Sequence, residues 1–458
     1  SGLKNGDEKI VLRDHLGNVA DEVHYADDGE WPKAADGTGP SLELVNPGYD
    51  KRSGQAWAAG AGAGTPGAAN SAFSADAKPL IRAARHRPAV PTSRDVVTIA
   101  CEVTCPTAAV DAVELAWRID GAAEFTVVPM FDDGLHGDGA ALDGVYAAQI
   151  GPFPHGTIVC FAAAAWSATG RWRVVPAAWE TDPSVTMLFQ VHDNLPEWDG
   201  PTYRIIMTQA RRTALQTRDI YSDALLDATF ICGDRILYNA GLRYRGELSR
   251  ERDPKGYRLN FSNDKQFLGM KRVNLIGYLP ETQHLGMTLF RSSDVPAPRS
   301  RMVRLVFNGQ ITNRYGHVEA VHNQFIARRF KGDDEGNLYR GVEAANLDYR
   351  GPDKESYRPH YHKRTKVELD DYTDVIDLCE AFANTPDAAF TAAIRARIDA
   401  EEWARFFAVH AAIATHTGGV ASDNGNDFYL YRRPSDNRFV LIPWDVDDSW
   451  QVADSQER

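Results

Sequence analysis

Six short apolar segments follow one another between residues 79 and 192, and they constrain the fold of this region more than any other feature of the chain. In order they read DVVTIACEV, AVELAWRI, FTVVPMF, GVYAAQI, TIVCFAAAAW and VTMLFQV. Short strands at this spacing, separated by turn-forming residues, are typical of an all-β sandwich. We therefore predict an immunoglobulin- or fibronectin-like β-sandwich over residues 79–192.

The loop DDGLHGDGAALDG, at residues 132–144, places four aspartates between two of these segments. Such a loop raises the question of a calcium site, but its spacing does not match that of an EF-hand loop. Aspartate side chains also bind backbone N–H groups in tight turns between strands. We interpret the loop as a series of such turns.

The chain contains five cysteines, which are too few for a disulfide scaffold. Cys160 alternates with apolar residues in TIVCFAAAAW and is therefore expected to lie on a buried strand. In a secreted sandwich it could form a disulfide with Cys101 or Cys105, and the alternative is that all of them are buried free thiols. The sequence leaves both possibilities open.

The first part of the chain, residues 1–70, contains strand and turn signals, among them KIVLRD and VADEVHY around the turn LGN. The order of these segments resembles the second half of a lamin-tail domain, a small immunoglobulin-like sandwich. The resemblance implies a partial domain whose first strands would precede Ser1. Residues 71–78 end a stretch rich in Gly, Ala and Pro, and we predict that they form a linker.

The composition excludes two classes of function. The formal net charge is −13, whereas a protein that wraps nucleic acid normally carries a basic stripe. No run approaches the roughly 18 apolar residues that a membrane-spanning helix needs. The sequence SGLKNGDEKI at the start lacks the pattern of a signal peptide.

From about residue 200 the pattern changes to mixed α and β. Strand-like segments such as YRIIMTQ and RMVRLVFNG come first, and Asn308-Gly309 is a strong hairpin signal. Helical patterns follow in LDDYTDVIDLCEAFA and in EEWARFFAVHAAIATHT, the second opening with a capping-box pair, Asp399 and Glu402. Two further strands, DFYLYRR and RFVLIPW, come last. We predict one α+β domain over residues 200–458.

Acidic and amide side chains gather at the ends of these last two strands. Asp423, Asn426 and Asp427 precede the first strand, and Asp445 and Asp447 follow the second. In an antiparallel hairpin the start of one strand lies beside the end of the next, so these side chains should converge.

Converging carboxylates repel one another unless a cation compensates their charge. Hard oxygen ligands suit Mg²⁺ or Mn²⁺, and Mg²⁺ held by one or two carboxylates is typical of phosphoryl transfer from ATP. The order of Asp423, Asn426 and Asp445 also matches the catalytic Asp, metal-binding Asn and metal-binding Asp of protein kinases. We predict a metal-dependent phosphoryl-transfer site here, although for any single aspartate a solvated loop is the simpler interpretation.

A phosphate-binding segment is expected upstream of this site. The segment GLRYRGELSRERDPKGYRLNF, at residues 241–261, combines a turn at Gly246 with the basic residues Arg245, Lys255 and Arg258. Basic side chains beside a glycine turn can hold nucleotide phosphates.

These segments, together with VFNGQITNRYGHVEAVHNQFIARRF, GNLYRG and FVLIPWDVDD, resemble the CotH family. That family comprises spore-coat-type atypical kinases with a protein-kinase-like fold, and the resemblance covers about residues 200–450. It implies an ATP-dependent kinase that acts on Ser and Thr of secreted or coat proteins. The N-terminal modules suggest, with it, an extracellular or cell-surface protein.

The resemblance also implies roles for individual residues. Asp423 is the essential loop aspartate, Asp445 binds the metal, and Asp447 is a second acidic contact. Lys255 or Arg258 contacts the nucleotide. Glu319, after the Asn-Gly hairpin, matches a family glutamate near the nucleotide.

Three positions depart from the family pattern. Leu248 stands where the family has a serine, Asn313 where it has a glycine, and Asp427 where it has an asparagine. A kinase-like surface or coat protein without activity therefore remains an alternative. So does a phosphohydrolase that uses two metal ions and no nucleotide.

Overall fold

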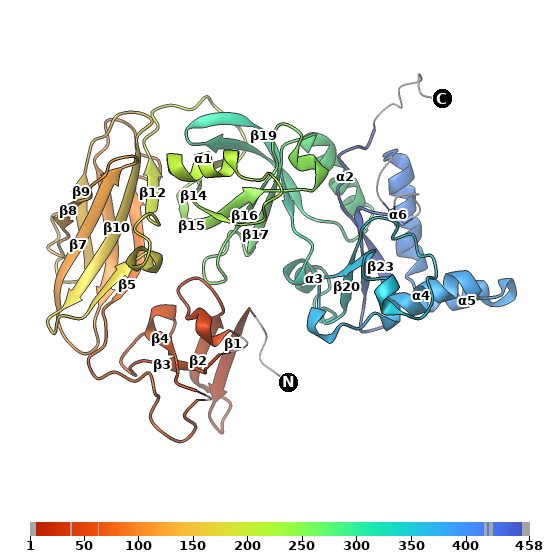
Figure 1. The fold of residues 1–458 in the computed structure, drawn as a ribbon, viewed down its shortest axis with the longest axis horizontal. Helices are drawn as coiled ribbons and strands as arrows, with labels where there is room; N and C mark the ends of the chain where they lie inside the picture. The colour runs from red at the N-terminus through yellow and green to blue at the C-terminus, as the bar shows by residue number, and fades with distance from the viewer. Residues whose placement is uncertain (1–5, 37–38, 63, 416–418, 421–424, 451–458) are drawn as a thin grey trace. The chain divides into compact units, whose positions relative to one another are not determined.

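The computed structural model describes residues 6–36, 39–62, 64–415, 419–420 and 425–450. The chain divides into two compact units, and Figure 1 shows their elements in chain order. The first unit comprises Ser1–Arg243, Leu259–Lys271 and Arg304–Thr312, and the second comprises Tyr244–Arg258, Arg272–Val303 and Asn313–Arg458. The chain passes between the units within β15 (Arg235–Tyr244), β16 (Tyr257–Asn260), β18 (Ser300–Phe307) and β19 (Gln310–Glu319).

The first unit begins with two small antiparallel sheets. The predicted hairpin around LGN is present as β1 (Asp7–Arg13) paired with β2 (Val19–Ala26), and β3 (Leu42–Leu44) pairs with β4 (Trp57–Ala59). Two short 3₁₀ helices accompany them, η1 (Lys33–Ala35) and η2 (Gly54–Ala56). The lamin-tail assignment of residues 1–70 stays a prediction.

The segment predicted as a linker is bound to this first part of the chain. The Ala72 N–H and the Ser71 hydroxyl both donate to the buried carboxylate of Glu43, each at 2.8 Å. The Ser74 N–H donates to the carbonyl of Val45. A buried carboxylate is stable only when it accepts hydrogen bonds, and Ser71 and Ala72 supply them to Glu43. Residues 71–78 are therefore packed against the first part of the chain and do not form a free linker.

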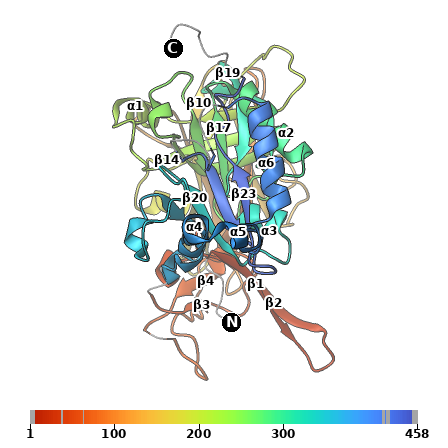
Figure 2. The same ribbon diagram turned by 90° about the vertical axis from the view of Figure 1, so that its right-hand side faces the viewer.

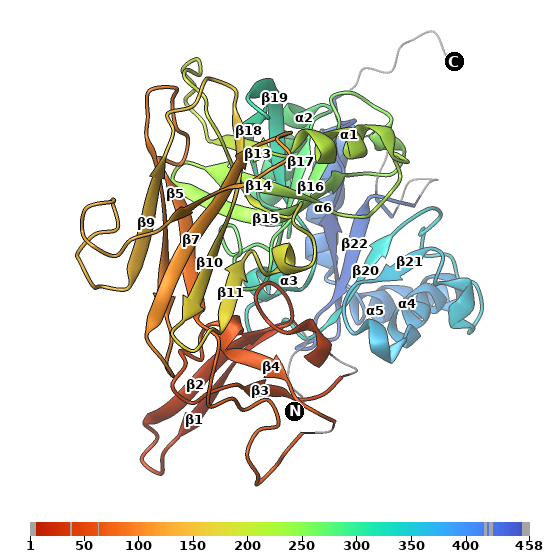
Figure 3. The ribbon, with the colours of Figure 1, turned by 60° about the vertical axis from the view of Figure 1, so that its left-hand side comes forward.

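Two sheets follow, drawn in Figure 3, and their buried side chains form one core cluster. One sheet has the order β5-β6-β9, and in the other β11-β10-β7-β8 form a path with β12 paired to β10. The strands are β5 (Leu80–Arg87), β6 (Val97–Thr104), β7 (Val110–Ile119), β8 (Thr126–Pro129), β9 (Val145–Ile150), β10 (Ile158–Ser167), β11 (Trp172–Val175) and β12 (Met187–Gln190), with the short helix η3 (Ala177–Glu180) before β12. All six predicted strands are present, and the sequence patterns missed β5 and β11.

Side chains alternate between the two faces of a strand, and this alternation shows whether Cys101 and Cys160 can form the disulfide that the sequence left open. Cys101 faces the core between the two sheets, whereas Cys160 lies on the opposite face of its strand, with Leu188 and Ile206. All five cysteines are free thiols. A bridge between these two would need side chains that point away from each other to meet.

The acidic loop at residues 132–144 consists of turns, as predicted. Its carboxylates accept backbone N–H groups within the loop: Asp132 from Gly144 at 2.9 Å, and Asp138 from Gly134 at 2.7 Å.

The rest of the first unit continues with β13 (Thr202–Ile206), α1 (Gln209–Thr217), β14 (Leu226–Cys232) and β15. β13 pairs antiparallel with β14 and parallel with β18. The predicted hairpin turn is confirmed, because Asn308 and Gly309 both have positive φ, 46° and 78°.

The second unit is built around a sheet of order β21-β20-β22-β23. Its elements are η4 (Leu248–Arg250), β17 (Arg272–Ile276), α2 (Pro280–Ser292), α3 (Asn323–Arg329), β20 (Asn337–Gly341), η5 (Lys354–Ser356), β21 (Tyr361–Lys363), η6 (Val367–Leu369), α4 (Thr373–Asn384), α5 (Asp387–Arg395), α6 (Ala400–Ala412), β22 (Phe428–Arg432) and β23 (Phe439–Pro443). β17 pairs antiparallel with β19.

Both faces of this sheet are buried. Phe428, Leu430 and Leu441 pack with the helices α2, α4 and α6 in one core cluster, while Tyr429 and Ile442 pack with α3 in another. Burial on both faces explains why FYLYR and FVLIP read as continuous apolar runs.

The amino-terminal turn of α6 covers the outer edge of β23, and Figure 2 shows the helix lying along that strand. The Asp399 carboxylate caps the helix by accepting the Glu402 N–H, as predicted. Glu402 does not complete a capping box, because its carboxylate accepts the Leu441 N–H at 3.0 Å. Helix α6 ends at Ala412, earlier than its sequence pattern indicates.

Among the helices in the described part of the chain, none is long and apolar enough to cross a membrane.

Candidate functional site

The hairpin β22–β23 brings the predicted acidic residues together at one end. Phe428 pairs with Pro443, and the Trp444 N–H donates to the Asp427 carbonyl at 3.0 Å. Asp427 and Asp445 therefore flank the last cross-strand bond of the hairpin. The predicted convergence is thus present for Asp427 and Asp445, whereas Asp423, which it also included, lies outside the described residues.

Asp427 and Asp445 both have a left-handed backbone, with φ of 58° and 48°. This conformation costs on the order of 1 kcal/mol for a residue other than glycine, and such residues cluster at functional sites. Here the conformation redirects the chain at both strand ends.

Burial and mutual repulsion dominate the electrostatics of the cluster. Desolvation, followed by the charge of Asp445, raises the pKa of Asp427 to about 8. Desolvation and the charges of Asp445 and Asp448 raise the pKa of Asp447 to about 7. A cation at this position would relieve both effects.

Asn426 offers a further oxygen ligand. Its Oδ1 atom is buried and accepts no hydrogen bond from the described residues. The backbone of the same residue is fixed, because its carbonyl accepts the Gly419 N–H at 2.8 Å. A buried amide oxygen beside carboxylates is a donor set that suits Mg²⁺ or Mn²⁺.

Within the described ranges, no group of three or more His, Cys, Asp or Glu side chains is placed to hold a metal by itself. Mg²⁺ needs fewer protein ligands, because waters and phosphates complete its shell. The residues present therefore fit a cation that arrives with a nucleotide.

Arg340, on β20, supplies positive charge beside this cluster. Arg340 pairs with Tyr429 across the sheet. The next pair along the two strands is Gly341 with Phe428, and Phe428 directly follows Asp427 in the chain. Burial opposes the charge of Arg340, yet the surrounding negative groups, including Asp427 and Asp445, raise the pKa of its guanidinium.

The Glu247 carboxylate contacts the guanidinium of Arg340. The Glu247 Oε1 atom lies 3.4 Å from Arg340 Nη1, and the Arg340 side chain is 22% exposed. Arg340 Nε is buried without a hydrogen-bond partner among the described residues. The sequence analysis did not assign Arg340, although it lies in the segment GNLYRG that carried the family resemblance.

Arg245, a predicted nucleotide contact, belongs to this site. Its guanidinium carbon lies 5.4 Å from the centre of the Trp444 ring, and its charge lowers the pKa of Asp447 against the larger effect of burial. Arg252 acts on Asp447 in the same direction and stacks on Tyr278 at 4.7 Å. The sequence analysis did not single out Arg252.

The other predicted phosphate contacts are held by local partners. Lys255 Nζ donates to the Glu251 carbonyl at 3.1 Å and lies 3.4 Å from a carboxylate oxygen of Asp253. Arg258 Nε donates to Asn274 Oδ1 at 3.1 Å. A role of either residue at the nucleotide stays a prediction.

Glu319 lies in a buried ion pair. Its two carboxylate oxygens accept Nε and Nη2 of Arg328 at 2.9 and 2.6 Å, and the Arg299 N–H also donates to it. The structure thus joins Glu319 to these arginines, and its predicted place near the nucleotide stays a prediction.

Asp423, the predicted catalytic residue, lies outside the described residues. Thr415, a described residue that precedes Asp423 in the chain, donates from its Oγ1 atom to a carboxylate oxygen of Asp448 at 2.7 Å.

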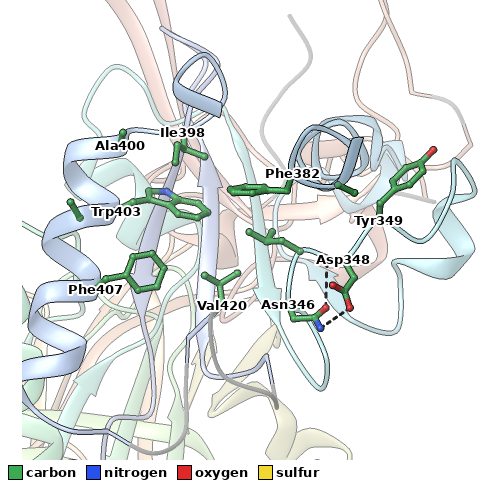
Figure 4. A pocket seen from close by; sticks show the side chains of 12 residues that line it. Asn346, Asp348, Tyr349, Phe382, Ile398, Ala400, Trp403, Phe407 and Val420 are labelled. Atoms are coloured by element: carbon green, nitrogen blue, oxygen red, sulfur yellow. Dashed lines mark hydrogen bonds between the residues drawn. The ribbon is translucent and has the colours of Figure 1, made fainter. Parts of the chain in front are cut away.

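A groove of about 590 Å³ opens in the second unit (Figure 4). Trp403 and Phe407 of α6 line one side, Phe382 of α4 lines the other, and Val420 lies below them. The sequence analysis did not predict this groove, because its residues come from segments far apart in the chain.

Comparison with known proteins finds matches to the second half of the chain. Residues 242–458 match the family described as CotH kinase protein. The inner spore coat protein H of Bacillus subtilis strain 168 is 24% identical over 241 residues, which cover 51% of this chain and 64% of that protein.

A solved structure, the Helicobacter pylori proinflammatory kinase CtkA, aligns with 51% of this chain and 57% of its own length, at 6% identity and a TM-score of 0.20. The chain thus spans less than two thirds of each of these proteins.

Proposed function

Because residues 242–458 belong to the CotH family, we propose that this part of the chain is an atypical protein kinase. It transfers the γ-phosphoryl group of ATP to Ser or Thr hydroxyls of secreted or surface proteins. The N-terminal β modules, a lamin-tail-like segment and an immunoglobulin-like sandwich, carry the kinase domain to an extracellular or cell-surface location.

In the proposed reaction, the substrate hydroxyl oxygen attacks the γ-phosphorus. The bond from that phosphorus to the β–γ bridging oxygen breaks, and ADP leaves. The hydroxyl proton passes to the Asp423 carboxylate. The protein contributes mainly by positioning the reactants and stabilising charge.

Asn426, Asp427, Asp445 and Asp447 would hold a Mg²⁺ or Mn²⁺ ion. When bound, the ion neutralises negative charge on the nucleotide phosphates. Burial of the carboxylates keeps their charge poorly compensated without it, so binding of the metal–nucleotide complex is favoured.

Arg245, which lies over the Trp444 ring, would bind the phosphates. Lys255 or Arg258 would be a further contact to the nucleotide, and Glu319 would lie farther from it. A planar guanidinium can bind phosphate through two parallel hydrogen bonds, which fixes orientation as well as charge.

The observation that most supports the proposal is the buried Asn426 Oδ1 atom, which has no hydrogen-bond partner among the described residues and belongs to the residue directly before Asp427. A buried polar atom without a partner costs free energy, and a ligand that binds there recovers it.

The test is transfer of label from γ-labelled ATP, with Mg²⁺ or Mn²⁺, to the protein itself and to a Ser-containing peptide. Asp445→Asn and Asp423→Asn are compared with the wild type, and Glu343→Gln, an exposed carboxylate, is the control. Label that appears with the wild type and control, and is lost in both site variants, supports the kinase. Absence of both label and nucleotide-dependent stabilisation would refute it.

A second candidate is a kinase-like surface or coat protein without catalytic activity. Leu248, where the family has a serine, is 77% exposed in the basic segment, and the Bacillus relative is named as a coat protein. Nucleotide binding without transfer would favour this candidate.

A further inference from the structure

The groove of Figure 4 is joined by backbone hydrogen bonds to the segment that precedes Asp427. Asn346 begins one wall, and the residue before it, Ala345, donates its N–H to the Gly425 carbonyl at 2.9 Å. Gly419, the residue before the lining residue Val420, donates to the Asn426 carbonyl. Two backbone hydrogen bonds therefore join the groove to the chain that carries Asn426.

The walls of the groove are apolar and held in place. The Phe382 and Trp403 rings stack at 6.2 Å, and the Phe407 ring meets Trp403 edge-on at 6.2 Å. The Trp403 indole N–H donates to the Phe439 carbonyl at 3.0 Å. A preformed aromatic pocket binds a bulky apolar side chain with little ordering cost.

One charge lies at the rim. Among the described residues that line the groove, Asp348 alone is charged, and it is exposed. Asn346 Nδ2 donates to its Oδ2 at 2.7 Å, which fixes the carboxylate beside the apolar walls. The rim therefore favours a cationic group next to the apolar side chain and disfavours an anionic one.

The volume of the groove exceeds that of one side chain and lies in the range of sites that bind a ligand of several groups. An extended peptide advances about 3.3 Å per residue, so a segment seated here reaches the carboxylate cluster within a few residues. A polypeptide fits this continuity better than a small molecule confined to the groove.

We propose that this groove binds the protein substrate. It accepts a segment with a bulky apolar side chain next to Lys or Arg, a few residues from the Ser or Thr that is phosphorylated. This inference rests on the proposed kinase function, and it assigns the position and chemistry of substrate recognition.

The test uses two fluorescent peptides, measured by anisotropy with the full chain and without nucleotide. Both contain a Ser a few residues from a Phe, and the Phe is followed by Lys in one peptide and by Glu in the other. The wild type should bind the Phe-Lys peptide about fivefold more tightly, as expected for one exposed ion pair gained or lost.

Two variants examine the two recognition elements. Asp348→Lys should reverse the preference between the peptides, whereas Glu343→Lys, an exposed charge reversal outside the groove, should not. Phe407→Ala should weaken both peptides about tenfold through lost apolar contact. Leu369→Ala, at a 65% exposed position outside the groove, should change neither.

Phe407→Leu keeps an apolar side chain at this position and should retain most of the binding. It is the control for a folding defect in Phe407→Ala. Equal binding of both peptides by wild type and Asp348→Lys would overturn the proposal. A dimer that dissociates on Phe407→Ala would also overturn it, because the groove would then hold a second copy of the chain.

The outcomes separate this inference from the kinase proposal. Binding with the expected charge reversal, without label transfer and without nucleotide-dependent stabilisation, supports the groove as a peptide site and refutes the kinase. Label transfer whose KM for the Phe-Lys peptide is unchanged by Asp348→Lys supports the kinase and refutes the groove.

Discussion

At the scale of single residues, Asp427 and Asp445 combine two features that each cost free energy in a folded protein. Both have a left-handed backbone, and the Asp427 carboxylate is buried in the field of other carboxylates. Such costs persist only where the surrounding structure imposes them. They mark the end of the hairpin as a part of the second unit in which such costs are concentrated.

Replacing Asp427 with Asn should stabilise the protein in cation-free buffer at pH 8. Asn tolerates the left-handed backbone, and it removes a carboxylate whose pKa is raised from 3.8 to about 8. The sign follows from the raised pKa, because ionisation of Asp427 is disfavoured in the folded state. The gain should be about 1 kcal/mol in urea unfolding.

If Mg²⁺ and ATP bind as proposed, they should raise the melting temperature of the wild type, and Asp427→Asn should lose this rise. The control, Glu343→Gln, should keep it. A destabilised Asp427→Asn protein in cation-free buffer would contradict this account of the cluster.

Replacing Arg340 with Met should destabilise the protein by about 2 kcal/mol, because it leaves the half-buried Asp427 and Asp445 without their compensating charge. Arg340→Lys should cost less, since the charge remains. Urea unfolding with and without Mg²⁺ measures both effects, and added Mg²⁺ should restore part of the loss in Arg340→Met. Equal stability of Arg340→Met and the wild type in both buffers would show that this arginine does not balance the cluster.

At the scale of elements, α6 and β23 depend on a buried carboxylate. Glu402 is 3% exposed, accepts the Leu441 N–H through Oε2, and has a buried Oε1 without a partner among the described residues. Burial raises its pKa from 4.5 to about 8. Burial therefore favours the protonated form of Glu402 more strongly than the Leu441 N–H favours the ionised one.

The stability that protonated Glu402 contributes should be complete below about pH 4.5 and should be lost as the pH rises through about 8. Glu402→Gln should remove this dependence and raise the melting temperature at pH 8 more than at pH 5. Melting curves across this range measure the effect. The exposed neighbour Glu401→Gln should leave the dependence as in the wild type, and a flat wild-type profile would contradict the prediction.

Patterns in the local sequence predicted most helices and strands, but they did not predict the contacts between elements that are distant in the chain. The hairpin β22–β23 and the Asp399 cap depend on residues a few positions apart, and both are confirmed. Glu402 fits the capping-box pattern, yet it binds Leu441, because a tertiary contact outweighed the local one. Arg340 was missed for a similar reason, since only the pairing of β20 with β22 brings it to the acidic cluster.

At the scale of the whole molecule, the chain combines β-rich modules with a region that matches the CotH family, and all five of its cysteines are free thiols. Cys101, Cys160 and Cys379 are buried, and burial raises the pKa of each thiol to between about 11 and about 12. A thiol that rarely ionises reacts slowly with oxidants.

We therefore expect five titratable thiols in the denatured protein and slow reaction of most of them in the native protein. A reducing agent should leave the melting temperature unchanged. Thiol titration with and without denaturant measures this. Three thiols in the denatured state, and a melting temperature that falls on reduction, would instead indicate a disulfide.

The covering of the outer edge of β23 has a consequence for how the chain is made. An uncovered edge strand of sequence FVLIP would be a template for pairing with other chains and for fibril growth. Arg397, Asp399 and Glu402 satisfy its outer backbone groups instead. They precede the strand in the chain, so during synthesis the segment that protects this edge leaves the ribosome before the edge itself.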